Sequence, residues 1–126
     1  MSKQTIQTDR APAAIGPYSQ AVISGGFLFT SGQLPIDPAT GKIPEGTIEE
    51  KAHMVFKNLE AIAKEAGTNL DNAVKTTVYL ADIDNFQAVN TVYAQYFKEP
   101  YPARSAFQVA ALPLGADVEV EAIFQL

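Results

Sequence analysis

Residues 47–67, TIEEKAHMVFKNLEAIAKEAG, carry the pattern on which the fold assignment depends. Apolar side chains recur every three or four residues, which is the period of a helix that buries one face. Thr47 and Glu50 have the spacing of a capping box, and Gly67 supplies a stop signal after the last apolar position. The stretch therefore predicts a helix over 48–66 with a buried stripe of Ile48, Ala52, Val55, Phe56, Leu59, Ile62, Ala63 and Ala66.

A second helical pattern lies nearer the C-terminus. Asp82 or Asp84 can cap its start, Lys98 falls in its last turn, and Pro100 prevents its continuation. The spacing predicts a helix over about 84–98 with an apolar stripe of Phe86, Val89, Tyr93, Tyr96 and Phe97.

Strands are predicted on both sides of these helices. Segments 74–80, 103–109 and 118–124 alternate in polarity and are rich in β-branched or aromatic residues. Segments 21–23 and 27–30 flank Ser24-Gly25-Gly26, which is typical of a β-hairpin with a glycine-bearing turn. The proline-containing segment 34–44 is predicted to be a loop.

The order of these elements indicates an α+β fold in which two helices cover one face of a mixed sheet. At 126 residues, the chain has the size of a single domain spanning residues 1–126. Two helices shield only one sheet face, yet segment 27–29 is apolar on both sides. We therefore expect another subunit to cover the second face.

Composition excludes several classes of function. A net charge of −5 opposes binding to nucleic acid, because Lys and Arg supply the energy of that binding. The chain has no cysteine, so disulfides and thiolate metal sites are excluded. The N-terminal residues lack an apolar signal region and no stretch is long enough to cross a bilayer, so we expect a cytoplasmic protein without membrane contact.

His53 is the only histidine, which excludes metal sites built on several histidines and RNA cleavage by a histidine pair. It falls on the first predicted helix, off the main apolar face, and we expect it to be a solvated helix residue. Any chemistry must then use Arg, Glu, Asp, Tyr, Asn, hydroxyl or backbone groups with water, and we expect no metal or organic cofactor.

Arg104 is the first candidate for such chemistry. Strand periodicity places it with Ala106 on one face, opposite Ser105 and Phe107. Its guanidinium matches a carboxylate with two parallel hydrogen bonds, which suits it to anchor an anionic substrate. The alternative is an arginine at a strand edge that pairs with a surface carboxylate.

Glu119 and Glu121 share one face of the last predicted strand. If that strand neighbours the strand of Arg104, one glutamate could orient or deprotonate a water molecule near the arginine. Alternation does not decide between the two, and both could be solvated. Asn90 lies on the apolar stripe of the second helix, so its amide must find a hydrogen-bonding partner or face a cavity.

Two turn-rich segments flank the predicted hairpin and could line a site. Tyr18 follows Pro17 and can place a phenol in a pocket, while Ser31 and Gly32 permit close approach of a ligand to the backbone. Gly32 belongs to no phosphate-binding motif.

Taken in order, these segments resemble the RidA family of reactive-intermediate deaminases. The resemblance covers nearly the whole chain and rests on AAIGPYSQA (13–21), TSGQ (30–33), VKTTVYL (74–80), NF (85–86) with Val89, Asn90 and Tyr93, PARS (102–105) and EVEA (119–122).

The resemblance implies a trimer of chorismate-mutase-like subunits with ligand clefts between neighbouring subunits. It also implies hydrolysis of 2-imino acids such as 2-iminobutanoate and 2-iminopropanoate to 2-oxo acids and ammonia, without a cofactor. By position, Arg104 resembles the arginine that holds the substrate carboxylate, and Glu119 resembles the carboxylate near the attacking water. The other residues in cleft-lining positions are Tyr18, Ser31, Gly32, Asn90, Ala106 and Phe107; Ala106 stands where many relatives carry a cysteine, which excludes an obligatory thiol.

Two other functions remain open at this level. The same cleft could sense 2-oxo acids or other carboxylates without turnover. An endoribonuclease or translation inhibitor, a label attached to some relatives, is opposed by the acidic charge and by the single histidine.

Overall fold

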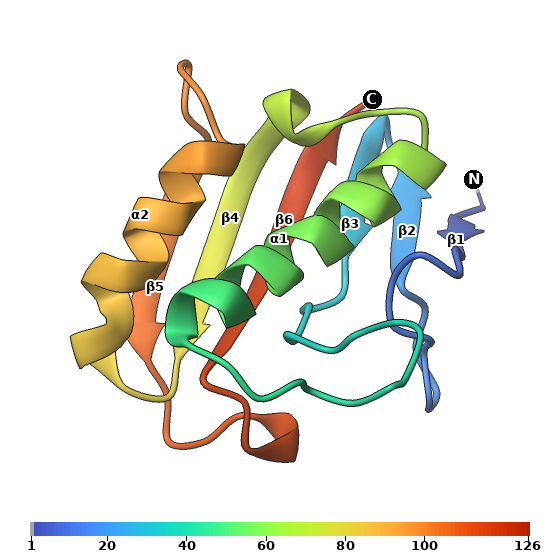
Figure 1. Ribbon diagram of the computed structural model, residues 1–126. Helices are drawn as coiled ribbons and strands as arrows, with labels where there is room; N and C mark the ends of the chain where they lie inside the picture. Colours follow the sequence, from blue (N-terminus) through green and yellow to red (C-terminus); the bar gives the residue numbers. More distant parts are fainter. Residues whose placement is uncertain (1) are drawn as a thin grey trace.

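The computed structural model describes residues 2–126. Six strands form one sheet in the order β1-β2-β3-β6-β4-β5, with β4 and β5 parallel and the other pairs antiparallel. Both helices lie across the same face of this sheet (Figure 1), as predicted for an α+β fold. The elements are β1 (Gln4–Ile6), β2 (Ala21–Ser24), β3 (Phe27–Thr30), α1 (Ile48–Glu65), β4 (Ala73–Leu80), α2 (Phe86–Tyr96), β5 (Ala103–Gln108) and β6 (Val118–Gln125), with 3-10 turns at Leu70–Asn72, Ile83–Asn85 and Pro113–Gly115.

Helix α1 confirms the opening prediction to within one residue. The Glu50 amide donates to Thr47 Oγ1 at 3.1 Å and the Thr47 amide donates to Glu50 Oε1 at 2.8 Å, so the capping box is complete. The predicted stripe is buried against the sheet from Ala52 to Ala63. Because this helix packs on β6 and β3, it fixes which face of the sheet becomes the core.

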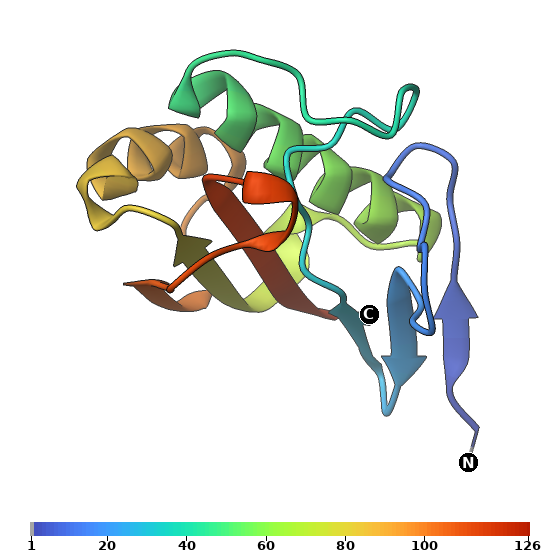
Figure 2. The same ribbon diagram turned by 90° about the horizontal axis from the view of Figure 1, so that it is seen from below.

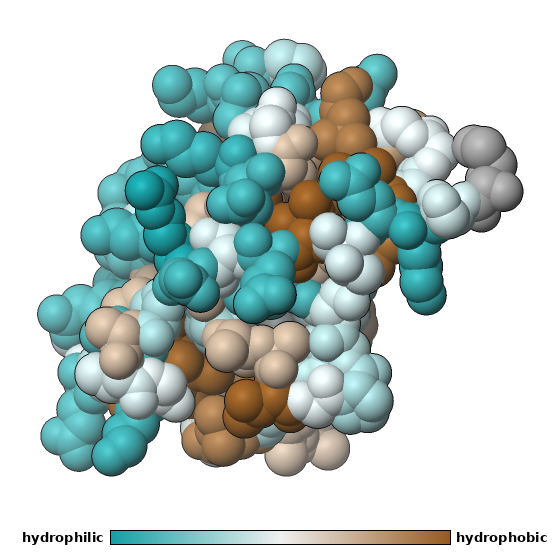
Figure 3. Space-filling view, turned by 90° about the vertical axis from the view of Figure 1, so that its right-hand side faces the viewer, coloured by the Kyte–Doolittle hydropathy of each residue, from teal (hydrophilic) through white to brown (hydrophobic). Residues whose placement is uncertain are grey.

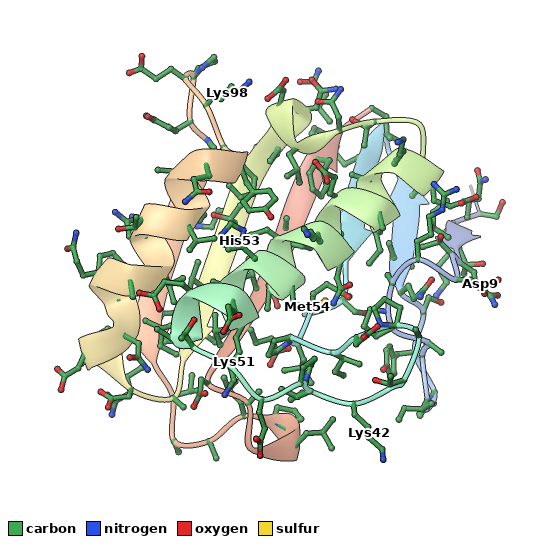
Figure 4. All side chains as sticks on the ribbon, viewed as in Figure 1. Asp9, Lys42, Lys51, His53, Met54 and Lys98 are labelled. Atoms are coloured by element: carbon green, nitrogen blue, oxygen red, sulfur yellow. The ribbon has the colours of Figure 1, made fainter. Side chains whose placement is uncertain are left out.

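Helix α2 is shorter than predicted. Residues Ile83–Asn85 form a 3-10 turn capped by the Asp82 side chain, and the α-helix begins at Phe86. It ends at Tyr96 because Phe97 adopts an extended conformation, so Lys98 lies beyond the helix, in the connection to β5 (Figure 4). The prediction of Lys98 in the last turn was therefore wrong.

Strand β1 was not predicted from the sequence. It is short, pairs only with β2, and is followed by a segment attached to the buried Gln20 side chain. Gln20 Oε1 accepts a hydrogen bond from the Thr8 amide at 2.7 Å, and Nε2 donates to the Pro12 carbonyl at 2.8 Å. A buried glutamine thus replaces the strand pairing that this segment lacks.

The two faces of the sheet differ in what covers them. On the helix side, alternate residues of β6 from Val118 to Phe124 are buried. In the part of the chain drawn in Figure 2, no helix lies on the opposite face. That face exposes 38% of Phe27, 42% of Phe29 and 45% of Phe107, alongside charged and polar residues such as Lys75 and Glu121. Between residues 2 and 126, neither helix has the length and apolar content needed to cross a bilayer.

Candidate active site

The guanidinium of Arg104 contacts uncharged side chains of helix α2. Its strand partner is the buried Thr76, so the arginine lies on the helix side of the sheet. The guanidinium Nη1 donates to Asn90 Oδ1 at 2.7 Å. The guanidinium carbon lies 4.7 Å from the Tyr93 ring centroid and 5.4 Å from that of Phe86, which are cation–π distances. Asn90 thus has the partner that its position on the helix required.

These contacts leave the positive charge of Arg104 uncompensated. Among residues 2–126, the one ion pair within 4.0 Å joins Lys51 and Asp117, away from this arginine. Asn90 occupies one of five guanidinium N–H donors, so enough remain to bind a carboxylate with two hydrogen bonds. A cavity of about 430 Å³ adjoins the guanidinium and is lined by Asn90, Tyr93, Ala94, Tyr101, Pro102 and Arg104.

Glu119 lies on the opposite face of the sheet, beside Tyr79 of β4. Its side chain is half-buried, and burial together with the nearby charge of Glu121 raises the pKa of the Glu119 carboxyl above its usual value. A Cβ atom built on Gly32 would overlap the Glu119 carboxylate, lying 2.8 Å from Cδ and closer still to Oε2. The absence of a side chain at Gly32 therefore leaves the space that the Glu119 carboxylate occupies.

The loop after β3 is attached to β6 beside this glutamate. The amide of Gln33 donates to the Val120 carbonyl at 2.8 Å, and the Val120 amide donates to the Gln33 carbonyl at 3.1 Å. Ser31 Oγ donates to the Ser19 carbonyl at 2.6 Å, which joins the two turn-rich segments. Together they enclose a cavity of about 530 Å³ whose lining includes Tyr18, Ser31, Gly32 and Glu119.

The same cavity has an extensive apolar wall. Ile15, Leu34, Ile36, Pro113 and Leu114 line it together with the polar residues. Ile15 is 84% exposed and Leu114 is 67% exposed. Figure 3, which faces the β1 side of the sheet, shows apolar residues gathered at its lower end, where Figure 1 places the loops between strands and helices.

One chain does not bring Arg104 and Glu119 together. Strand β4 separates β5 from β6, and the two side chains lie on opposite faces of the sheet. Within one chain the two strands are not neighbours, because β4 pairs with both, so the condition for a direct approach of Glu119 to Arg104 is not met. The structure instead yields two half-sites, one of Arg104 and Asn90 and the other of Tyr18, Ser31, Gly32 and Glu119.

Ala106 and Phe107 are divided in the same way. Ala106 pairs with the buried Val78 and is half-buried on the helix side, as predicted from its spacing to Arg104. Phe107 lies on the open face of the sheet, the one that no helix covers, and its ring centroid is 5.4 Å from that of Tyr79. Since Tyr79 pairs with Glu119, Phe107 belongs to the face of the glutamate.

His53 is a structural residue, though not the solvated one expected. It lies between the two helices (Figure 4), with its Nδ1 at 2.9 Å from Tyr96 Oη. It is half-buried, and neither cavity described above includes it. Among residues 2–126, no three His, Asp or Glu side chains are grouped closely enough to hold a metal ion.

The sequence did not reveal that Phe86 and Tyr93 contact the guanidinium of Arg104, or that Thr76 is hydrogen-bonded to Tyr93. Tyr93 and Phe86 were predicted as members of an apolar stripe, and Thr76 as an ordinary strand residue. A signal was present, since Phe86, Asn90 and Tyr93 are spaced to share one helix face. The sequence did not show which strand packs against this helix face.

Comparison with known proteins identifies the family. The sequence model of the endoribonuclease L-PSP family matches residues 8–125. The human protein named 2-iminobutanoate/2-iminopropanoate deaminase is 50% identical over 121 residues, which are 96% of this chain and 88% of that protein.

Solved structures agree with this result. RidA from the Antarctic bacterium Psychrobacter sp. PAMC 21119 has a TM-score of 0.93 at 50% identity, covering 98% of this chain and 99% of that one. E. coli TdcF, solved with bound serine, has a TM-score of 0.92 at 41% identity and covers 98% of each chain. This chain therefore belongs to the L-PSP/RidA family, as the resemblance of its motifs indicated.

Proposed function

We propose that this protein hydrolyses 2-imino acids, such as 2-iminobutanoate and 2-iminopropanoate, to 2-oxo acids and ammonia. The observation that carries the proposal is an arginine held in place by uncharged groups beside an open cavity. Such a guanidinium is prepared for an anionic ligand, and the substrates in the name of the human relative are small carboxylates.

Substrate binding begins at Arg104. Two charge-assisted hydrogen bonds to the carboxylate, each contributing about 1.5–3 kcal/mol, hold the acid in one orientation. The Asn90 amide and the Tyr93 ring keep the guanidinium from turning away. The imine carbon next to the carboxylate is then placed for attack by water.

Glu119 supplies the proton transfers. The imine protonated at nitrogen is electrophilic at carbon, and Glu119 accepts a proton as water adds to that carbon. Glu119 returns this proton to the nitrogen of the carbinolamine. The C–N bond then breaks and ammonia leaves, while Glu119 takes the proton of the hydroxyl group as the C=O bond of the 2-oxo acid forms. That proton passes to the released ammonia, which restores the Glu119 carboxylate. A carboxyl whose pKa is raised by burial is a better base than an ordinary glutamate and still returns its proton.

The two half-sites meet when copies of the chain assemble. We infer a homotrimer in which Arg104 and Asn90 of one copy face Tyr18, Ser31, Gly32 and Glu119 of its neighbour. The exposed Phe27 and Phe29 on the open face of the sheet favour such an assembly, because apolar surface of this kind marks interfaces. Each single domain of residues 1–126 would thus contribute to two clefts.

The first test generates 2-iminobutanoate in situ with a dehydratase and follows the formation of 2-oxobutanoate. We expect acceleration by the wild-type protein and none by Arg104→Ala or Glu119→Ala. Loss of two charge-assisted bonds predicts a decrease in kcat/KM of at least about 10²-fold for Arg104→Ala. Equal rates for the wild type and Arg104→Ala would remove the basis of the proposal.

A mixing experiment tests the shared cleft. Arg104→Ala and Glu119→Ala proteins are unfolded together, refolded in equal amounts, and assayed. If each cleft takes one residue from each of two copies, about a quarter of the clefts regain both residues and activity returns to that fraction. If the mixture stays as inactive as either variant alone, Arg104 and Glu119 do not act across an interface.

Binding without turnover is the second candidate function. E. coli TdcF was solved with serine, which also carries a carboxylate, and this favours a carboxylate sensor built on the same arginine. Calorimetric titration with 2-oxobutanoate, combined with the deaminase assay, separates the two. Binding that depends on Arg104 with no release of ammonia would select the sensor.

A further inference from the structure

A buried polar contact lies directly beneath Arg104. Thr76 Oγ1 and Tyr93 Oη are 2.7 Å apart, and Thr76 is fully buried in the middle of β4. A hydroxyl at such a position requires a partner, and Tyr93 provides it from the facing helix. The contact joins the strand next to β5 with the helix that carries Asn90.

The Tyr93 ring is packed closely between aromatic side chains and the guanidinium of Arg104, with one part bordering the cavity. Its centroid lies 5.6 Å from that of Phe56 and 4.5 Å from that of Phe97, and only 6% of the residue is exposed. The guanidinium of Arg104 lies over the same ring at 4.7 Å. The orientation of the ring therefore determines where the guanidinium rests.

We propose that the Thr76–Tyr93 hydrogen bond is a positioning device for the carboxylate anchor, setting the plane of Arg104 through the Tyr93 ring. The inference rests on the proposed function of Arg104. Thr76 is buried away from the cavity. The Tyr93 ring borders the cavity, but its hydroxyl contacts Thr76, so we assign the hydrogen bond between them a positioning role that acts through the guanidinium.

The uncharged character of the device matters for its role. A carboxylate beneath Arg104 would position the guanidinium too, but it would neutralise the charge that binds the substrate. Tyr93 stays neutral because burial, the largest effect, raises the pKa of its phenol. A neutral ring and a neutral amide hold the arginine and leave its full charge for the ligand.

The test compares two tyrosines of the same helix. Tyr93→Phe removes the hydroxyl that contacts Thr76, and Tyr96→Phe removes a hydroxyl that contacts His53 instead. Thr76→Val removes the other partner with little change in volume, and Thr76→Ser retains the hydroxyl. The measurements are kcat and KM for 2-iminobutanoate, the Kd of 2-oxobutanoate by calorimetry, and the free energy of unfolding.

We expect Tyr93→Phe and Thr76→Val each to raise KM and the Kd of 2-oxobutanoate by about fivefold to tenfold, a tenfold change being 1.4 kcal/mol. We expect kcat to stay within about twofold, because the step at the imine carbon is not altered. Thr76→Ser and Tyr96→Phe should retain wild-type values. In Tyr93→Phe combined with Thr76→Val, stability should recover relative to Thr76→Val alone, while KM stays high.

Wild-type KM and Kd in both Tyr93→Phe and Thr76→Val would overturn the inference. An equal rise in Tyr96→Phe would also overturn it, since that variant only weakens helix packing. If the wild type binds 2-oxobutanoate through Arg104 but releases no ammonia, the deaminase proposal fails, and the Kd values still decide the role of Thr76 and Tyr93.

Discussion

Replacing Gly32 by alanine is the sharpest test of how Glu119 is held. The added Cβ would lie 2.8 Å from Cδ of Glu119 and closer to Oε2. Restoring an ordinary contact of 3.4 Å moves Cδ by about 0.6 Å and the nearer oxygen by about 1 Å or more. Gly32 is not among the glycines with positive φ, so alanine adds no backbone strain and the side chain must move.

A displacement of about 1 Å at a catalytic group can reduce a rate by about 10²-fold, equivalent to about 2.7 kcal/mol in activation free energy. We expect Gly32→Ala to lower kcat for 2-iminobutanoate by this order. Because Arg104 is untouched, the Kd of 2-oxobutanoate should change much less. Stopped-flow or coupled measurement of 2-oxobutanoate formation gives the first quantity, and calorimetry gives the second.

Gly46→Ala is the matched control. Its Cβ would lie 2.8 Å from Glu50 Oε1, so it crowds a glutamate carboxylate in the same way but at the capping box of α1. We expect up to about 1 kcal/mol lower stability with unchanged kcat. If Gly32→Ala turns over at the wild-type rate, the position of the Glu119 carboxylate has no catalytic importance.

Five further predictions concern pH, assembly and stability. Because folding raises the pKa of Glu119, the folded state favours the protonated carboxyl. Glu119 therefore adds to the free energy of unfolding at a pH below its pKa in the unfolded chain, and this added stability is lost as the pH rises through its pKa in the folded protein. Glu119→Gln should therefore unfold with a higher free energy than the wild type at neutral pH and with an equal one in acid, as chemical denaturation measures. The wild-type kcat/KM should fall as acidity protonates Glu119, at a pH above the usual glutamate range, and a pH–rate profile with an ordinary glutamate midpoint would contradict this. Phe29→Lys should yield monomers in sedimentation and lose activity, whereas trimers of full activity would argue against the open face as an interface. Thr47→Ala should cost about 1 kcal/mol in denaturant titration with unchanged kcat/KM. Leu114 adopts φ +60°, a conformation that asparagine tolerates better, so Leu114→Asn should raise the free energy of unfolding by about 0.5–1 kcal/mol.

Local signals predicted the elements well where they were strong. The capping box at Thr47 and the three-and-four spacing after it are properties of consecutive residues, so helix α1 was found to within one residue. Strand β6 was found for the same reason, since its alternation depends only on its own side chains. Strand β1 has three residues, carries no such pattern and is held by its pairing with β2, while the side chain of Gln20 holds the segment that follows, so it was missed.

The candidate residues were predictable as types rather than as a site. An arginine among small residues and a glutamate in an alternating strand could be named from the sequence, together with the resemblance of their motifs. Their placement could not, because strand order depends on long-range pairing that alternation does not record. Whether the strands of Arg104 and Glu119 are neighbours was left open by the sequence, and in the structure β4 lies between β5 and β6.

The amino-acid sequence by itself determined the helices, most strands, the α+β class and which residues are candidates for binding an anionic substrate. Only the tertiary structure decided that Arg104 and Glu119 lie on opposite faces of the sheet and that the guanidinium of Arg104 packs on the Tyr93 ring. The physical reason is that periodicity fixes the direction of a side chain relative to its own strand or helix. The neighbour toward which it points is set by packing between segments far apart in the chain.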